Sequence, residues 1–155
     1  MRVGMFVDID DTFKHVGGKF HHKKLNYRKL YEYVKGLGEL EKAMAYGITM
    51  GTEAVGFLKI LHEIGFETKY IKTNRTNNNT QRVNLTVDIL GSLEDFQKIV
   101  LVASNLDYLP LCQKLSSWDK NVIIIGSNIS EKFEQYAMYC IEIPISWLEI
   151  KEKKS

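Results

Sequence analysis

Three carboxylates follow a short apolar run near the start of the chain. The run MRVGMFV leads directly into Asp8, and Asp10 and Asp11 come within the next three residues. A carboxylate at the end of a buried strand is costly unless a partner compensates its charge. Such groups can hold a hard divalent cation, supply a nucleophile together with its acid, or form a polar loop. The stretch alone leaves these three possibilities open.

Two further acids stand where they could join this group. Asp107 follows the apolar run KIVLVAS at 98–104, and Asp88 lies in a stretch with helical periodicity at 80–93. Asp107 could equally cap the helix that follows it, and Asp88 could lie on a solvated helix face. Whether the acids meet depends on the elements that carry them.

Six short apolar runs, rich in β-branched residues, alternate with amphipathic stretches. Runs of this kind predict strands buried on both faces of a parallel sheet. The predicted strands are 2–8, 42–49, 67–73, 98–104, 121–127 and 139–145. The predicted helices are 25–37, 52–64 with Gly65 as its C-cap, 80–93, 108–115, 130–138, and a short one within 146–155. The alternation predicts an α/β fold, a three-layer α/β/α sandwich with a mainly parallel sheet of five or six strands. One domain is expected at 1–148, followed by a basic tail at 149–155.

The charge is unevenly distributed along the chain. The formal net charge is +2, but the windows 14–29 and 69–82 hold ten of the 21 basic residues and none of the 19 acids. This segregation favours an anionic partner, although two solvated loops would look the same. In open α/β sheets, ligands bind beyond the carboxyl ends of the strands, where the acids and the basic windows are expected to meet. That combination suits a metal-dependent enzyme acting on a phosphodiester.

The sequence has few features of a membrane or secreted protein. No apolar run approaches the ~20 residues that span a bilayer, and the N-terminus lacks a signal-peptide pattern. Cys112 and Cys140 are 28 positions apart with no CxxC motif, which favours neither a zinc site nor a disulfide framework. We therefore expect a cytoplasmic location.

The opening motif resembles that of one enzyme family. VGMFVDIDDTF is similar to the first motif of haloacid-dehalogenase-type phosphatases, apolar residues followed by DxDxT. The resemblance implies Asp8 as nucleophile, Asp10 as general acid/base and Mg²⁺ as cofactor. The later acidic motif of that family is matched only by Asp107, and Asp88 is left without a role.

A second resemblance covers more of the chain. KIVLVASNLDYLPLCQKL at 98–115 resembles the signature of NYN domains, relatives of the PIN-like ribonucleases that include LabA-like proteins, in which a strand runs into Ser-Gly-Asp-x-Asp-Phe-x-Pro-Leu. QRVNLTVDIL at 81–90 resembles the family's Lys-Gly-Val-Asp helix, and FVDIDD resembles its Ile-Asp-Gly-x-Asn strand end. The similarity extends over about 3–148 and is the one we prefer.

This resemblance implies a metal-dependent ribonuclease with a PIN-like, Rossmann-like fold. The implied catalytic and metal-binding residues are Asp8, Asp88 and Asp107, with Asp11, Asn84 and Asn105 in support. The implied cofactor is Mg²⁺ or Mn²⁺, and the implied partner is RNA, expected to be single-stranded, with a homodimer as a further possibility. Basic residues expected on the RNA backbone are Lys14, Lys19, Lys23, Lys24, Arg75 and Arg82.

The departures from the family motifs matter for this prediction. Asn84 and Asn105 stand where the family usually has acids, and Mg²⁺ prefers anionic oxygens. The alternative is therefore a catalytically weakened NYN-type module that binds RNA or a protein partner. Phe13 and Tyr108 are aromatic residues near the predicted site that could stack on a base or pack in the core.

Overall fold

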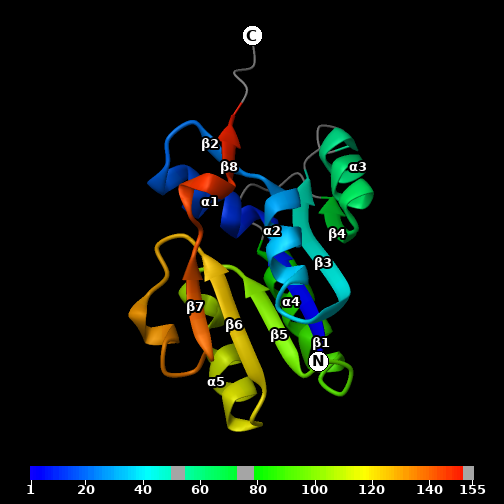
Figure 1. Cartoon of the computed structure of the whole chain (residues 1–155), viewed down its shortest axis with the longest axis vertical. Helices are drawn as coiled ribbons and strands as arrows, with labels where there is room; N and C mark the ends of the chain where they lie inside the picture. Colours follow the sequence, from blue (N-terminus) through cyan, green and yellow to red (C-terminus); the bar gives the residue numbers. More distant parts are fainter. Residues whose placement is uncertain (50–54, 73–78, 152–155) are drawn as a thin grey trace.

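A six-stranded parallel sheet forms the centre of the molecule (Figure 1). The structure, a computed structural model, describes residues 1–49, 55–72 and 79–151. The strand order is β4-β3-β1-β5-β6-β7, and every neighbouring pair is parallel. The strands are β1 (Arg2–Asp8), β3 (Glu39–Thr49), β4 (Glu67–Lys72), β5 (Lys98–Val102), β6 (Asn121–Gly126) and β7 (Tyr139–Glu142). The predicted α/β fold with a mainly parallel sheet is confirmed.

Helices cover both faces of the sheet. They are α1 (Ile9–Lys19), α2 (Tyr27–Lys35), α3 (Val55–Ile64), α4 (Thr80–Gly91) and α5 (Leu109–Ser117). Successive side chains of a strand point to opposite faces, so Met5 packs with Leu30 of α2 in one core cluster. Phe6 packs in the other cluster with Leu85 of α4 and Leu115 of α5. These two clusters make the three-layer sandwich. No helix within the described ranges is long and apolar enough to cross a bilayer.

A second, two-stranded sheet lies beyond the main one. Strand β2 (Lys23–Leu25) pairs antiparallel with β8 (Leu148–Ile150). The sequence predicted neither strand, and the short helix expected within 146–155 is wrong, because Leu148–Ile150 is extended. Only a single 3-10 turn, η3 (Ile145–Trp147), precedes this strand. In Figure 1, α1, β2 and β8 lie beyond the carboxyl ends of β5, β6 and β7.

The predicted helix at 130–138 is also wrong. Only a 3-10 turn, η2 (Glu131–Phe133), forms there, and Ser130 caps it by accepting a hydrogen bond from the backbone of Lys132. The backbone of Met138 already donates to Val122 at the start of β6, so the chain has begun to follow the sheet. By contrast, Gly65 does end α3 as predicted, with a φ of +131° that favours glycine.

The strand order places a topological switch point between β1 and β5. The chain leaves β1 toward β3 and β4 on one side, then crosses through α4 to β5 on the other side. The segments that follow β1 and β5 therefore diverge to opposite faces and leave a crevice at their carboxyl ends, the usual ligand position in such sheets. Asp8 and Asp11 lie on the side of the crevice formed by the end of β1 and the start of α1. Ser104 to Tyr108, which follow β5, lie on the other side.

Candidate functional site at the β1–β5 crevice

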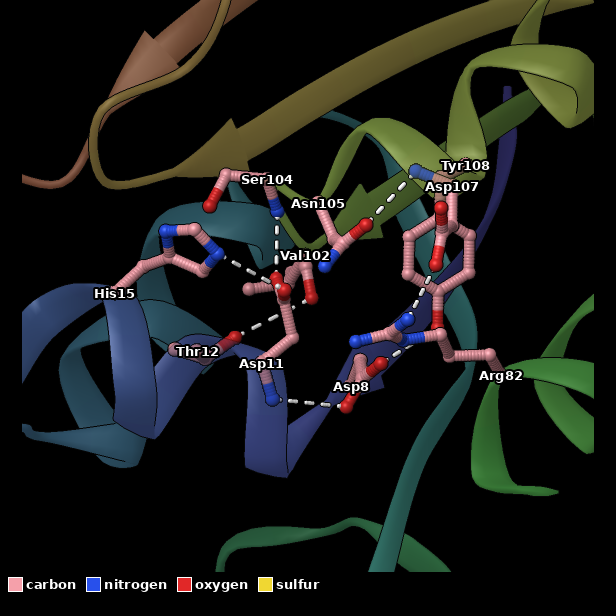
Figure 2. A network of polar contacts seen from close by, with 10 residues as sticks. All are labelled: Asp8, Asp11, Thr12, His15, Arg82, Val102, Ser104, Asn105, Asp107 and Tyr108. Carbon is pink, nitrogen blue, oxygen red and sulfur yellow. Dashed lines mark hydrogen bonds and ion pairs between the residues drawn. The ribbon is translucent and has the colours of Figure 1, made fainter. Parts of the chain in front are cut away.

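Asp8 stands at the end of β1 and is completely buried. It is the N-cap of α1, with its Oδ1 accepting a hydrogen bond from the backbone of Asp11 at 3.0 Å. Its Oδ2 accepts a hydrogen bond from the hydroxyl of Tyr108 at 2.6 Å (Figure 2). Burial raises the pKa of Asp8, and the two hydrogen bonds only partly oppose this effect. Asp8 is therefore a buried carboxylate at the switch point, and it accepts hydrogen bonds from both sides of the crevice.

Asp11 ties the first turn of α1 to the end of β5. Its Oδ2 accepts a hydrogen bond from the backbone of Ser104 at 2.7 Å, and its Oδ1 lies 3.2 Å from Nε2 of His15. Thr12 adds a second link, since its hydroxyl donates to the carbonyl of Val102 at 3.4 Å. Asp11 is buried, and its contacts with Ser104 and His15 hold its side chain between α1 and the end of β5.

Asp107 and Asn105 lie on the β5 side of the crevice. Asp107 is in the 3-10 turn η1 (Leu106–Tyr108), and Asn105 directly precedes this turn. The side chain of Asn105 caps this turn by accepting a hydrogen bond from the backbone of Asp107 at 2.8 Å. The carboxylate of Asp107 is 68% exposed and binds the guanidinium of Arg82, which is only 20% exposed (Figure 2). The same guanidinium lowers the pKa of Asp8, against the larger effect of burial. Arg82, expected on an RNA phosphate, thus lies among the acids of the site.

Asp88 is held further along α4 by a separate set of partners. Its Oδ2 accepts hydrogen bonds from the hydroxyl of Tyr46 and the ammonium of Lys69, both at 2.7 Å. Burial raises the pKa of Asp88, but the Lys69 and Tyr46 contacts outweigh it and place this pKa below its ordinary value. Asn84 lies one turn earlier on the same helix and is partly buried.

The donor set does not fit a divalent cation held jointly by the three predicted acids. In the described ranges, no three Asp, Glu, His or Cys side chains come together as a metal site. Asp107 is paired with Arg82, Asp88 with Lys69, and Asp8 with Tyr108. The predicted metal shell is not assembled in this arrangement, because protein cations already neutralise two of its members. Their catalytic role stays a prediction.

Asp10 faces a different part of the edge. Its Oδ2 accepts a hydrogen bond from the backbone of Ile48 in β3 at 2.9 Å. Burial raises the pKa of Asp10 to about 6. The polar contacts of Asp8 and Asp10 are therefore made to separate elements, rather than to one shared site as the phosphatase interpretation expects.

The predicted RNA-binding lysines lie around α1 and β2. Lys14 is exposed, and Lys23 is partly buried. Lys19 lies 3.1 Å from Glu142, and Lys24 lies 3.5 Å from Glu149. Arg75 is outside the described residues.

A comparison with protein families decides between the two resemblances. The family model of the NYN domain matches residues 2–144, nearly the whole chain. The chain belongs to the NYN family. A solved structure from Vibrio parahaemolyticus, described as a protein of unknown function, is 20% identical, with 96% of each chain covered and a TM-score of 0.83. At that identity the likeness concerns the fold. No curated protein matches the sequence.

The NYN motif gives the position of Arg82 a clear meaning. Where the family helix motif has Lys-Gly-Val-Asp, this chain has Gln81, Arg82, Val83 and Asn84. A glycine is thus replaced by a long cationic side chain at the place where an acid is also lost. Over these four positions the positive charge moves from the first residue to the second, and one negative charge is lost.

The sequence interpretation missed several residues that contact the candidate acids. His15 had a detectable signal, because it stands four residues after Asp11 in a helix and so lies on the same face. Lys69 and Tyr46 had none, since they reach Asp88 from neighbouring strands through tertiary packing. Tyr108 is buried as a core residue, whereas Phe13 is 54% exposed, so core packing holds for Tyr108 and stacking by Phe13 stays a prediction.

Proposed function

We propose that this NYN domain binds single-stranded RNA along the carboxyl edge of its sheet, with protein cations in place of a divalent metal. The observation that carries the proposal is the ion pair between Arg82 and Asp107 beside the buried Asp8. A guanidinium at this position supplies a fixed positive charge and planar donors suited to a phosphate.

The basic residues of the edge support an RNA backbone as the ligand. Lys14, Lys19, Lys23 and Lys24 lie in α1 and β2, which Figure 1 places beyond the carboxyl ends of the strands. Lysines on an exposed edge attract phosphates without reading sequence, and their binding weakens as salt displaces the released counterions.

The Arg82 pair can exchange its partner for a phosphate. Asp107 is 68% exposed, so its carboxylate can turn to water when a phosphate takes its place beside Arg82. A cavity of about 360 Å³ lies directly beside the pair, lined by Arg82, Asp107, Tyr108 and the start of α4. Arg82 and Asp107 both line this cavity, so a phosphodiester that enters it can replace Asp107 as the partner of the guanidinium.

Metal-dependent cleavage of RNA is the second candidate. It is favoured by the two buried carboxylates, Asp8 and Asp11, because burying two acids within one helical turn opposes folding and is typical of functional sites. If Mg²⁺ or Mn²⁺ were bound, it would activate water and neutralise phosphate charge. The residues available to hold it would be Asp8, Asp88 and Asp107, and two of these would first have to leave Arg82 and Lys69.

Fluorescence anisotropy with a labelled single-stranded RNA tests the proposal. Binding should be equal in EDTA and in Mn²⁺ and should weaken steeply between about 50 and 200 mM salt. The same RNA should stay intact in both. Cleavage in Mn²⁺ that disappears in an Asp8→Asn variant would establish the second candidate, and absence of binding at the lowest salt would refute the proposal.

A further inference from the structure

A pocket of about 250 Å³ opens beside α1, away from the Arg82 pair. Three elements besides α1 contribute to it, namely β2, α2 and α3. The residues that carry the argument are Asp10, Thr12, Phe13, Lys24, Tyr27 and Phe57. Pockets for drug-sized ligands measure roughly 300–1,000 Å³, so this one fits a ligand of one or two rings.

Aromatic side chains make up much of the lining. Tyr27 and Phe57 meet edge to face with their ring centroids 5.3 Å apart. Phe13 is 54% exposed at the same pocket, and the ammonium of Lys151 lies 4.5 Å from the centre of its ring. An exposed ring beside a pocket of this size offers a stacking surface for a flat heterocycle, and bases stack on such rings in single-strand binding proteins.

Asp10 gives the pocket a polar group that selects its ligand. The hydrogen bond from the backbone of Ile48 at 2.9 Å fixes one carboxylate oxygen, Oδ2. Asp10 itself lines the pocket, so a ligand bound there lies beside a carboxylate. A carboxylate accepts hydrogen bonds from an amino group and repels a carbonyl oxygen. The pocket should therefore distinguish cytosine from uracil, two rings of equal size that differ in this group.

Lys24 places a positive charge at the same pocket. Its ammonium lies 3.5 Å from Glu149, and both side chains are nearly half exposed, at 43% and 46%. Exposed pairs of this kind contribute little to stability, so Lys24 can turn to a phosphate at little expense. An aromatic pocket, an acceptor and an exposed cation are together what one nucleotide requires.

We propose that this pocket accepts one base of the bound RNA strand, preferably cytosine, with Asp10 accepting from its amino group and Lys24 contacting its phosphate. The inference rests on the proposed function and adds a base-reading position to it. Both sites contain a residue that follows the carboxyl end of a strand, Asp10 after β1 and Asp107 after β5.

Titration with mononucleotides, followed by two-dimensional ¹H–¹⁵N NMR of the full chain, tests this pocket directly. Cytidine 5′-monophosphate should bind about tenfold more tightly than uridine 5′-monophosphate, as expected for a hydrogen bond to a charged group. In Asp10→Asn, which keeps an acceptor for Ile48, this preference should fall below about twofold, because an amide can also donate to uracil. Asp95→Asn is the matched control, since Asp95 is exposed at the other end of the sheet, just before β5.

Twelve-nucleotide poly(C) and poly(U) separate the pocket from the broader proposal. Preference for poly(C) that Asp10→Asn abolishes supports the base-reading position. Equal, salt-sensitive binding of both oligomers overturns the pocket and leaves RNA binding intact. Discrimination between the mononucleotides without binding of either oligomer keeps the pocket and removes the RNA proposal. Failure of every ligand overturns both.

Discussion

Replacing Arg82 with alanine should open the acidic site to a divalent cation. In the wild-type protein the guanidinium binds Asp107 and lowers the pKa of Asp8. A metal ion near these two carboxylates would therefore lie next to a fixed positive charge. Removing the side chain frees Asp107 and removes the repulsion at once.

The size of the effect follows from Coulomb's law. A divalent ion about 5 Å from a unit charge is repelled by roughly 1.7 kcal/mol at the dielectric constant of water, and by roughly 6.6 kcal/mol at an effective value of 20. Since about 1.4 kcal/mol corresponds to a tenfold change, the smaller figure already implies more than tenfold in affinity. Because Asp107 is 68% exposed, water screens the repulsion, and we expect an energy near the lower of these two figures.

Electron paramagnetic resonance of free and bound Mn²⁺ measures this affinity without an activity assay. Wild-type protein should leave millimolar Mn²⁺ essentially free, and Arg82→Ala should bind it at least tenfold more tightly. Arg28→Ala is the matched control, because Arg28 is exposed and also lies in the first turn of its helix, α2. Thermal unfolding checks that each variant is folded. Tight binding by the wild type, or no gain in Arg82→Ala, would refute the idea that the arginine replaces the metal.

Two further perturbations probe the contacts that build the edge. Tyr108→Phe removes the hydrogen bond to the buried carboxylate of Asp8 and should lower the free energy of unfolding, measured by urea titration, by about 1.5–3 kcal/mol. Tyr33→Phe, at an exposed ring, is the control and should change this free energy little. Equal effects of the two variants would show that the contact with Asp8 is not stabilising. Burial raises the pKa of Glu142, but hydrogen bonds from the backbone and the contact with Lys19 lower it by more than burial raises it. The pKa of this carboxyl in the folded protein therefore lies below its ordinary 4.5. Its stabilisation is therefore present above pH 4.5 and lost as the pH falls below that value. Glu142→Gln should thus be less stable than wild type at pH 7, by less than about 1 kcal/mol because the pair is exposed, and the difference should shrink as the pH falls below 4.5. Glu134→Gln, at an exposed glutamate, is the control; a difference independent of pH, or one matched by this control, would contradict this account.

The main sheet could be predicted because its strands are buried on both faces. In β6 the run VIII at 122–125 is apolar and buried throughout, and such continuity is enough to mark a central parallel strand. The edge elements carried no such signal. Strands β2 and β8 contain three residues each and depend on each other, a pairing across most of the chain that no local pattern reveals. The interval 130–138 has helical spacing, but only the turn η2 forms there, with Phe133 buried in the core cluster and Met138 already bonded to β6.

The candidate site was predictable in its position and not in its electrostatics. Acids that follow β1 and β5 had to meet at the carboxyl edge, and Asp8 and Asp11 do contact the β5 side. The partners of Asp88 and Asp107 depend on how α4 is rotated against the sheet. Nothing in the periodicity of 80–93 states that Arg82 turns inward while Val83 stays exposed.

The acids that this chain keeps are those that its own fold uses. Asp8 caps α1 and accepts from Tyr108, and Asp11 joins α1 to the end of β5, so replacing either with an apolar residue would leave buried donors unpaired.

An asparagine at an acid position of the family motif can keep a structural hydrogen bond without carrying a charge. Asn105 still caps its turn, a task that asparagine performs as well as aspartate. What an amide cannot supply is the charge that a divalent cation needs. The proposal that protein cations take the place of the metal therefore rests on the ion pair between Arg82 and Asp107, together with amides at two acid positions of the motif.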